Sequence, residues 1–279
     1  MKRDWLLQRV PQIATTVLVT VVLLACATVV NAQQKNPDDK WRFTITPYLW
    51  LPSLTGSLKT DPPAGFTSGI TDIGPGSYLE NLQFAGMLDF QVQKGKWSLQ
   101  GDIIYVDFSD HDRNAHFPGV LPGGGGWTVQ ADTGLKALVS EFAGAHSVFR
   151  NEHSNFDLLG GVRYANIDSN VSLNITGPLP AWVRSRTSAN KANFVDPIVG
   201  FKGKVGLGKK WHLPYYFDVG GFGIDSDVTL QAYTGVGYRF SNWFSLGLGY
   251  RYLYYNFGDT KRVKDLNVYG GSLAFNFTF

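Results

Sequence analysis

The chain has 279 residues, of which 44% are hydrophobic and 14% aromatic, with 32 glycines and a formal net charge of +3. The aromatic and glycine content is high for a soluble domain and natural for a membrane β-barrel, whose aromatic side chains gather at the membrane interfaces. The near-neutral charge excludes a basic field for nucleic acid. Beyond the N-terminal region no segment has about 20 consecutive apolar residues, which excludes helical membrane spans there.

The N-terminal region has the features of a secretory signal peptide. A positively charged start precedes an apolar run from Ile13 to Val30, and small residues offer a cleavage site after Ala32. Two alternatives are an uncleaved membrane helix and a lipoprotein signal in which Cys26, the only cysteine, is acylated. The sequence therefore predicts two parts, a signal peptide over residues 1–32 and an outer-membrane β-barrel over residues 33–279.

From Trp41 onward the chain alternates between apolar and polar residues. Trp41 and Phe43 share one face, for example, while Arg42 and Thr44 share the other. This period of two is typical of strands with one face in lipid and one in a polar interior. We predict an antiparallel transmembrane barrel of about ten strands: one from Trp41, then 83–92, 97–105, 133–149, 156–173, 195–207, 211–221, 228–240, 243–257 and one from Leu266.

The spacing between these strands alternates between short and long. Short turns are expected at Lys94-Gly95, 151–155, 208–210 and Ser241-Asn242, and long loops at Ser109–Trp127 and Asn174–Ala192. Short periplasmic turns and long extracellular loops are the pattern of outer-membrane barrels. The segment 52–82 is ambiguous, because 53–60 could extend the first strand and 77–82 could be a short helix. Eight or twelve strands are the alternatives.

With the apolar face outward, charged residues of both signs point into the barrel. A narrow lumen is filled by side chains, so these charges either pair with one another or line a constricted aqueous path. The residues predicted for this lumen constriction are Arg42, Asp89, Asp102, Asp157, Arg163, Asp196, Lys202, Lys204, Asp218, Arg239 and Arg251.

Aromatic residues cluster near the predicted strand ends, where amphipathic rings favour the membrane interface. The predicted membrane girdle is Trp211, Trp243, Phe244, Tyr250, Tyr252, Tyr254 and Phe279. Four other aromatics are predicted to point inward, namely Tyr216, Phe222, Tyr233 and Tyr255.

Catalytic and metal-binding patterns are weak. Asp110-His111-Asp112 with His116 could bind a divalent cation, but such an exposed loop is ordinarily just solvated. His146 is predicted to face lipid, which argues against a catalytic pair with Ser147. We therefore predict no enzymatic activity, no metal and no cofactor.

The last predicted strand ends on Phe279, with alternating apolar residues from Gly271 onward. A strand of this kind closes a barrel and leaves no edge unsatisfied in lipid. We expect it to contact the barrel-assembly machinery. The other expected partners are outer-membrane lipid and lipopolysaccharide, with no nucleic acid, and the sequence does not give the oligomeric state.

Several motifs resemble a family of uncharacterised proteobacterial outer-membrane β-barrel proteins. They are Phe43–Trp50, Asn81–Asp107, Val195–Gly200, Asp218–Gly223 with Ser226-Asp227, and Gly235–Phe240 through Gly249–Leu253. The resemblance covers nearly the whole mature chain. It implies an outer-membrane barrel and supplies no substrate or catalytic residues.

The sequence thus predicts an integral outer-membrane barrel whose narrow, charge-lined lumen passes small solutes or ions. The alternative is a sealed structural or surface-interaction barrel that acts through its extracellular loops. A hydrolase at the barrel rim is a third, more distant hypothesis.

Overall fold

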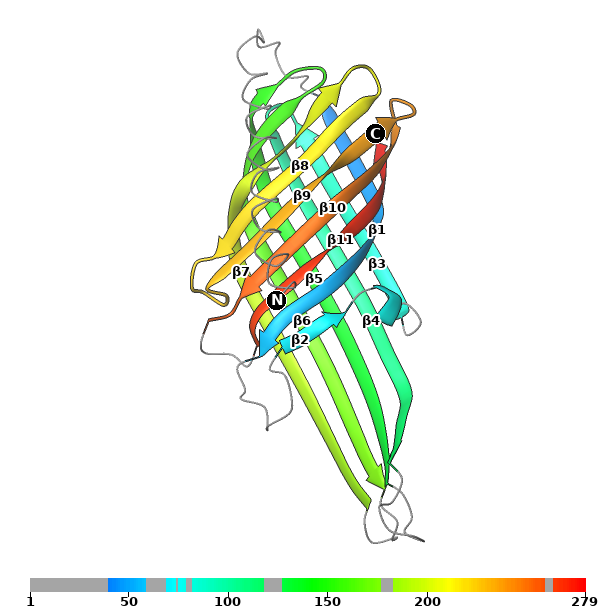
Figure 1. Ribbon diagram of the computed structural model, residues 1–279. Helices are drawn as coiled ribbons and strands as arrows, with labels where there is room; N and C mark the ends of the chain where they lie inside the picture. Colours follow the sequence, from blue (N-terminus) through cyan, green and yellow to red (C-terminus); the bar gives the residue numbers. More distant parts are fainter. Residues whose placement is uncertain are drawn as a thin grey trace, which may run out of the picture.

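The computed structural model describes residues 40–58, 69–73, 75–78, 82–117, 127–176, 183–258 and 263–279. Ten long strands form the wall of a closed antiparallel barrel, and an eleventh, short strand lies beside the first (Figure 1). The strands are β1 (Trp41–Leu58), β2 (Gly69–Ile73), β3 (Leu82–Lys94), β4 (Trp97–Phe117), β5 (Trp127–Arg150), β6 (Asn155–Thr176), β7 (Val183–Leu207), β8 (Trp211–Gly221), β9 (Val228–Arg239), β10 (Phe244–Asn256) and β11 (Val263–Thr278).

The barrel closes where β11 pairs with β1. This pairing is antiparallel and runs from Thr44 opposite Thr278 to Leu58 opposite Val263. At the end of the chain, the backbone of Phe279 exchanges hydrogen bonds of 2.8 and 3.0 Å with the backbone of Phe43. Closure pairs the edges that a membrane-embedded sheet could not leave open, and it confirms the predicted ten-strand barrel. No helix in the described part of the chain is long and apolar enough to cross a membrane.

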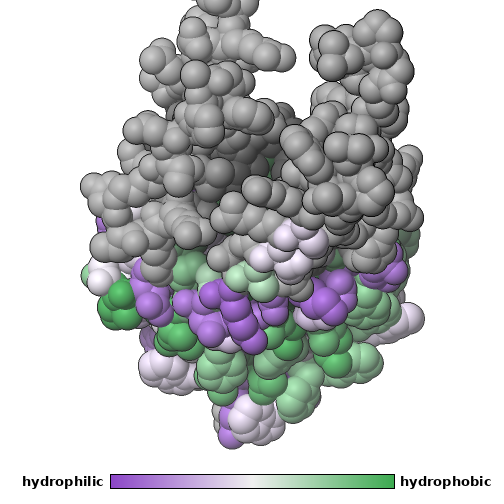
Figure 2. All heavy atoms as spheres, turned by 90° about the horizontal axis from the view of Figure 1, so that it is seen from below, coloured by the Kyte–Doolittle hydropathy of each residue, from purple (hydrophilic) through white to green (hydrophobic). Residues whose placement is uncertain are grey.

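The alternating sequence pattern sorts side chains between the two sides of the wall. Large apolar side chains such as Leu99 and Phe142 are exposed on the outside, whereas their polar neighbours Gln100 and Glu141 are buried inside. Seen from the long-strand end, hydrophobic residues gather on the outer wall beside a band of hydrophilic ones (Figure 2). An outer face of this kind matches a hydrocarbon environment, because exposed apolar area of that extent is disfavoured in water.

Four neighbouring strands, β4 to β7, are longer than the rest and project beyond one end of the barrel (Figure 1). Two predicted loops are therefore wrong in extent. Ser109–Phe117 belongs to β4 instead of a loop over Ser109–Trp127, and the loop expected over Asn174–Ala192 is mostly the paired ends of β6 and β7. These stretches are polar and lack the alternation of apolar and polar residues that is typical of a strand in contact with lipid. Their sequence therefore resembles a loop, although the backbone is paired.

The opposite end carries short turns after β3, β5, β7 and β9, as predicted. Gly95 and Gly208 have positive φ values of 57° and 82° in two of these turns, a conformation that glycine adopts without strain. In the ambiguous segment after β1, the first strand does extend to Leu58. The short helix α2 is a single turn at Pro75–Tyr78, which starts two residues before the predicted range 77–82 and overlaps its beginning.

The three prolines inside strands lie where a ladder is interrupted or ends. Pro47 has no paired residue on β11, and Pro214 has none on β9, although the pairing continues on both sides of each proline. Pro197 lies directly before the first β7 residue that pairs with β8, Ile198. Because proline has no backbone N–H, these positions lose little hydrogen bonding.

Candidate functional site

The lumen is divided into three layers along the barrel axis, because each strand changes character over a few inward-facing residues. On β1, Thr46 lines a cavity at the short-turn end, Tyr48 joins a polar network, and Trp50 enters an apolar cluster. On β10 the same order runs through Gly247, Arg251 and Leu253. The layers are therefore continuous across the interior.

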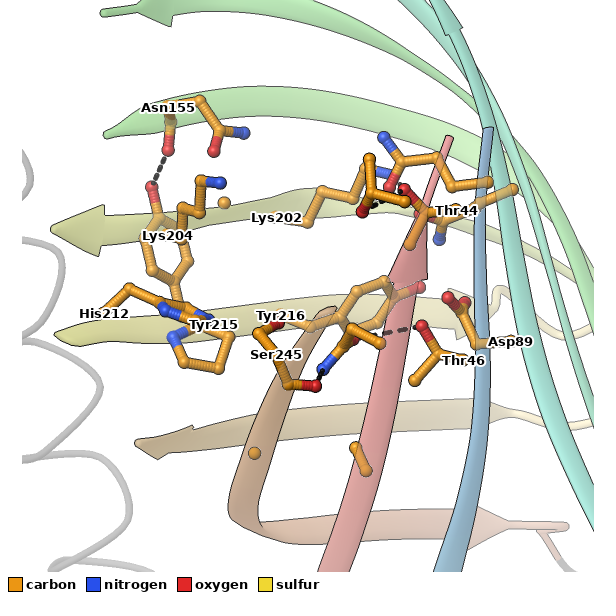
Figure 3. A pocket seen from close by; sticks show the side chains of 18 of the residues that line it. Thr44, Thr46, Asp89, Asn155, Lys202, Lys204, His212, Tyr215, Tyr216 and Ser245 are labelled. Carbon is orange, nitrogen blue, oxygen red and sulfur yellow. Dashed lines mark hydrogen bonds between the residues drawn. The ribbon is translucent and has the colours of Figure 1, made fainter. Parts of the chain in front are cut away.

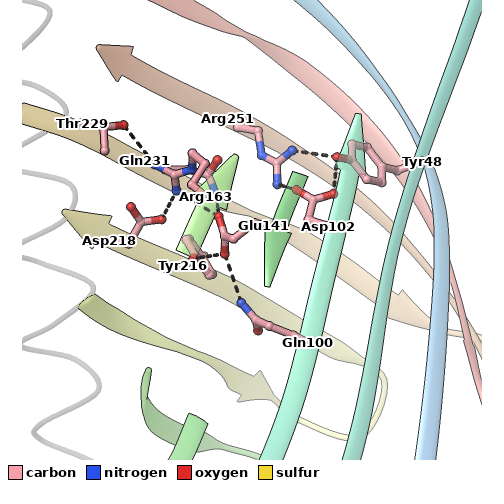
Figure 4. A network of polar contacts seen from close by, with 10 residues as sticks. All are labelled: Tyr48, Gln100, Asp102, Glu141, Arg163, Tyr216, Asp218, Thr229, Gln231 and Arg251. Carbon is pink, nitrogen blue, oxygen red and sulfur yellow. Dashed lines mark hydrogen bonds and ion pairs between the residues drawn. The ribbon is translucent and has the colours of Figure 1, made fainter. Parts of the chain in front are cut away.

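The middle layer is a network of charged and polar side chains centred on Arg163 of β6 (Figure 4). Arg163 forms ion pairs with Asp218 and with Glu141, the latter at 2.9 Å between Nη2 and Oε2, and it donates to Thr229 Oγ1 at 3.0 Å. Arg163 is 1% exposed and Asp218 0% exposed. Buried charges of this kind are stable only when paired, so the network fixes four strands to one another across the lumen.

Glu141 of β5 is the acceptor at the centre of this network. Its carboxylate accepts from the Tyr216 hydroxyl, from Gln100 Nε2 at 3.3 Å and from Gln231 Nε2 at 3.4 Å. The sequence prediction missed Glu141. The available signal was a lone acid in the otherwise apolar stretch of β5, at the same inward register as Ala143 and Ala145.

A second group of the same polar layer is centred on Arg251 of β10 (Figure 4). Arg251 forms an ion pair with Asp102 and donates to the Tyr48 hydroxyl at 2.7 Å, and that hydroxyl donates to Asp102 at 2.6 Å. The guanidinium also lies over the Trp50 ring, 5.6 Å from its centroid. Arg251 therefore connects the polar layer with the apolar cluster beside it.

The layer toward the long strands is apolar. Its buried aromatic rings include Phe194, which lies 4.6 Å from Phe257 between ring centroids, and Tyr255, which stacks on Phe257 at 5.5 Å. We call this group the apolar layer: Trp50, Met87, Ile104, Ala165, Phe194, Leu253, Tyr255, Phe257 and Val268. Packed apolar side chains of this kind disfavour water and ions, because neither can form hydrogen bonds there.

The layer at the short-turn end is a polar cavity of about 560 Å³, which reaches the turns after β5 and β9 (Figure 3). Tyr215 donates to the Asn155 carbonyl at 2.8 Å in its wall, and Lys202 donates to Gln91 at 3.2 Å and to Gln100. Charged groups in the wall include both acids and bases. The cavity ends at the polar layer, since Asp102, Glu141 and Arg251 also line it.

All eleven residues predicted for the lumen lie on the inner side of the wall, but in different surroundings. Arg163 and Asp218 form the polar layer, and Asp196 lies apart from the cavity. The Asp196 carboxylate accepts from the Ser226 backbone N–H at 2.9 Å and the Ser226 hydroxyl at 2.7 Å, which holds the β8–β9 loop. The other eight line the cavity: Arg42, Asp89, Asp102, Asp157, Lys202, Lys204, Arg239 and Arg251.

The predicted girdle residues divide between the two ends of the barrel. Trp211, Trp243, Phe244 and Phe279 lie at the short-turn end, and Tyr250, Tyr252 and Tyr254 follow further along β10 toward the long strands. Of the four aromatics predicted to point inward, Tyr216, Tyr233 and Tyr255 do so. Phe222 does not: it is 57% exposed in the β8–β9 loop with a φ of 51°. Alternation fails there because the chain has left the strand.

Within the part of the chain that the structure describes, the residues considered for catalysis do not form a catalytic arrangement. His146 lies on the outer face beside Trp97, 4.6 Å between ring centroids, whereas Ser147 is buried on the inner face and donates to the Phe149 carbonyl at 3.2 Å. Asp110, His111, Asp112 and His116 lie in β4. Adjacent residues of a strand point to opposite faces, so His146 and Ser147 cannot act as a pair.

The comparisons with known proteins agree with this architecture. The outer-membrane protease OmpT from Escherichia coli is similar with a TM-score of 0.51 at 11% sequence identity, covering 88% of this chain and 99% of that one. The translocator domain of NalP from Neisseria meningitidis gives 0.38 at 11% identity, covering 97% and 98%, and Ail from Yersinia pestis gives 0.33 at 9% identity, covering 87% and 100%. No family model and no curated protein sequence matches the chain.

At these identities the likeness concerns the fold alone. Together with the closed ten-strand wall and the apolar outer face, it places the chain in a class: an integral β-barrel of the Gram-negative outer membrane. In this class the short turns face the periplasm and the long strands face the cell exterior. The polar cavity is therefore at the periplasmic end, and the β4–β7 projection is extracellular.

Proposed function

We propose that this protein is a sealed, non-catalytic barrel that acts at the cell surface through the extracellular projection of β4 to β7. The observation that carries the proposal is the double barrier in the lumen. An ion entering from the periplasmic cavity meets the paired charges around Arg163 and then the apolar layer beyond them. Moving an ion through such packed apolar groups requires removing its hydration shell, which is very unfavourable.

The projection supplies a surface on which such a protein could act. A membrane-crossing strand in a barrel needs about 9–11 residues. β5 has 24 residues and β7 has 25, whereas β8 has 11 and β9 has 12. At about 3.3 Å per residue, the excess carries the four-stranded sheet well outside the membrane.

The proposal is tested by single-channel conductance of the refolded protein, lacking residues 1–32, in a planar bilayer. Folding is verified by heat-modifiable gel migration. We expect no steady conductance from the folded protein. Steady, voltage-tolerant steps would contradict a sealed lumen.

A narrow channel is the second candidate, and the periplasmic cavity favours it because one end of the lumen is already a polar cavity. In that case the charged residues of the polar layer and cavity form the constriction, and an opening motion must displace the apolar layer. Neutral replacements of Arg239 and Arg251 would then change the reversal potential. An unchanged value in a conducting protein would remove both from the pathway.

We further propose that residues 1–32 are removed as a signal peptide; these residues lie outside those that the structure describes. N-terminal sequencing of protein purified from outer membranes tests this, with Gln33 as the expected first residue. Acylation at Cys26 would instead leave a lipid detectable by mass spectrometry.

We also propose that the barrel-assembly machinery recognises the terminal strand. The Phe279 side chain is 70% exposed at the periplasmic end, although its backbone is paired with Phe43. Replacement of Phe279 by Ser should lower the amount of barrel in outer membranes while refolding in detergent is unchanged. Equal loss of refolding in detergent would assign Phe279 to barrel stability instead.

A further inference from the structure

Three cations at the mouth of the periplasmic cavity differ from the other cations of the lumen. They are Arg42 of β1, Lys204 of β7 and Arg239 of β9, and all three line the cavity. Within the described residues, none of them forms an ion pair or a side-chain hydrogen bond. They come from three strands that are not neighbours in the sheet, so the closure of the barrel brings them to one mouth.

Deeper in the lumen every positive charge of the wall has partners. Arg163 and Arg251 form ion pairs with carboxylates, and Lys202 donates to two glutamine side chains. Arg150, also near the mouth, pairs with Asp157 at 3.3 Å and donates to the Gly95 carbonyl at 3.0 Å. Among the described residues, the three cations therefore lack the side-chain partners that these other cations have; Asp89, an acid deeper in the cavity, likewise has no ion pair.

The mouth of the cavity carries two carboxyl groups, on Asp157 and Glu152, against four cations, the three above and Arg150. Asp157 acts on Lys204 electrostatically, but its oxygens are occupied by Arg150 and by Asn155 Nδ2, the latter at 2.9 Å. Glu152 lines the same cavity on the turn after β5. The like charges of Arg239, Arg42 and Arg150 all act on Lys204. Like charges held together repel one another, and an anion placed among them removes that repulsion.

From this geometry we infer that the periplasmic cavity binds a small solute carrying an oxyanion group, of the phosphate type, held by Arg42, Lys204 and Arg239. Arginine presents a planar fork of donors to phosphate oxygens, and lysine adds a compact charge. A volume of about 560 Å³ lies within the range of about 300–1,000 Å³ usual for small-molecule sites.

The remainder of the cavity wall indicates what the rest of the solute is like. Beyond the cations the wall carries neutral hydroxyl and amide groups, including Thr44, Thr46, Gln93, Ser245 and Asn276. It also carries five carboxyl groups, those of Asp89, Asp102, Glu141, Glu152 and Asp157, so the oxyanion has to lie at the three cations and the uncharged part of the solute beyond them. The hydroxyl and amide groups donate and accept hydrogen bonds, as the hydroxyls of a sugar do. A phosphorylated sugar therefore fits the wall better than an apolar anion.

The inference is tested by calorimetric titration of the folded protein in uncharged detergent at low salt. The probes are inorganic phosphate, glucose 6-phosphate and, as the neutral control, glucose. We expect saturable binding of glucose 6-phosphate, weaker binding of phosphate and none of glucose. Binding should weaken as sodium chloride is added, since the contacts are between charges.

The variant that removes the site is Arg42→Gln with Lys204→Gln and Arg239→Gln, which should weaken binding of glucose 6-phosphate at least tenfold. The matched control removes three exposed lysines from turns at the same end but outside the cavity, Lys94→Gln, Lys209→Gln and Lys210→Gln, and should bind as the unaltered protein does. Folding of each is checked by heat-modifiable migration, and Lys204→Gln alone serves if the triple variant does not fold.

Three results would overturn the inference: no saturable binding of either anion by the folded protein, unaltered binding by the cavity variant, or equal weakening in the control variant. The last would show general attraction to a charged end of the barrel. None of these outcomes depends on whether the lumen conducts, so the inference and the sealed-barrel proposal fail separately.

Discussion

Arg163 is the residue on which the interior of the barrel depends most. It is almost fully buried, and both of its carboxylate partners are buried with it. A buried ion pair adds little stability relative to an apolar replacement of the whole group, but breaking it leaves charges without a partner. The carboxylates of Glu141 and Asp218 would then face each other without a cation between them.

Replacement of Arg163 by Ala should therefore lower the free energy of unfolding by about 3–5 kcal/mol. Arg239→Ala is the matched control and should change it by less than about 1 kcal/mol, because Arg239 has no ion pair to lose. Urea titration of refolded barrels, with the folded fraction read from gel migration, measures both. Equal effects of the two substitutions would mean that the Arg163 network does not hold the strands together.

Gly200 illustrates a different residue-scale constraint, the close approach of backbone inside a small barrel. A Cβ atom at Gly200 would lie 2.0 Å from the Phe217 carbonyl oxygen and 2.7 Å from the Asp218 Cα. These are backbone atoms of a paired strand, so they cannot move aside without disturbing the ladder.

We expect Gly200→Ala to destabilise the barrel by about 1–3 kcal/mol, as overpacking does. Gly271→Ala provides the comparison, since a Cβ there meets no atom within 4 Å. The same urea titration distinguishes the two. A neutral Gly200→Ala would indicate that β7 and β8 can shift apart without loss.

At the scale of elements, the long strands β4 to β7 remain paired with one another far beyond the membrane. β5 pairs with β6 from Arg150 opposite Asn155 to Thr128 opposite Thr176. On the projection, β4 beyond Phe108 and β7 before Ile198 each pair on one side only. Such edges can accept an extended strand from a partner.

The register allows the projection to be removed without shifting the barrel. Asp110 pairs with Thr133, and Asn170 pairs with Ala189. Replacing residues 111–132 and 171–188 each by Asn-Gly should leave a folded barrel, because Asn-Gly favours the hairpin turn. Cells carrying this shortened barrel should resemble cells lacking the protein in any surface phenotype of the full-length chain. Full activity of the shortened barrel would locate the function elsewhere.

At the scale of the whole molecule, the sealed-barrel proposal gives the lumen two barriers one after the other. The polar layer and the apolar layer differ in chemistry, and each is formed by side chains from several strands of the wall. Removing one barrier leaves the other in place.

Conductance should therefore appear only when both barriers are weakened. Trp50→Ala with Phe194→Ala opens the apolar layer, and Glu141→Ala with Arg163→Ala opens the polar layer. The second pair also removes the cation partner of Asp218, so folding of each variant is verified by heat-modifiable migration. We expect no conductance from either pair alone and measurable conductance from the four substitutions combined. Conductance from one pair would show that its layer is the only barrier.

The sequence by itself determined the wall of this protein. Alternation at Trp41 to Thr46 and along β3 and β4 assigned the side that each residue faces, because a strand has a fixed period of two. The predicted count of about ten strands, which the alternation of short turns and long loops supported, is confirmed. Phe222 and the loops over Ser109–Trp127 and Asn174–Ala192 were misassigned. Outside the membrane there is no lipid to require apolar residues on one face, so the sequence of a strand need not alternate there.

Only the tertiary structure decided what the lumen contains. Tyr48 and Arg251 are 203 positions apart, and Lys202 and Gln100 are 102 apart, yet each pair is in contact. Such contacts depend on strand tilt and on the register at which the wall closes, which are properties of the whole ladder. For this reason the sequence showed which charges face inward, whereas closure of the barrel decided that Arg163 and Arg251 are paired and that Arg42, Lys204 and Arg239 have no ion pair with any residue that the structure describes.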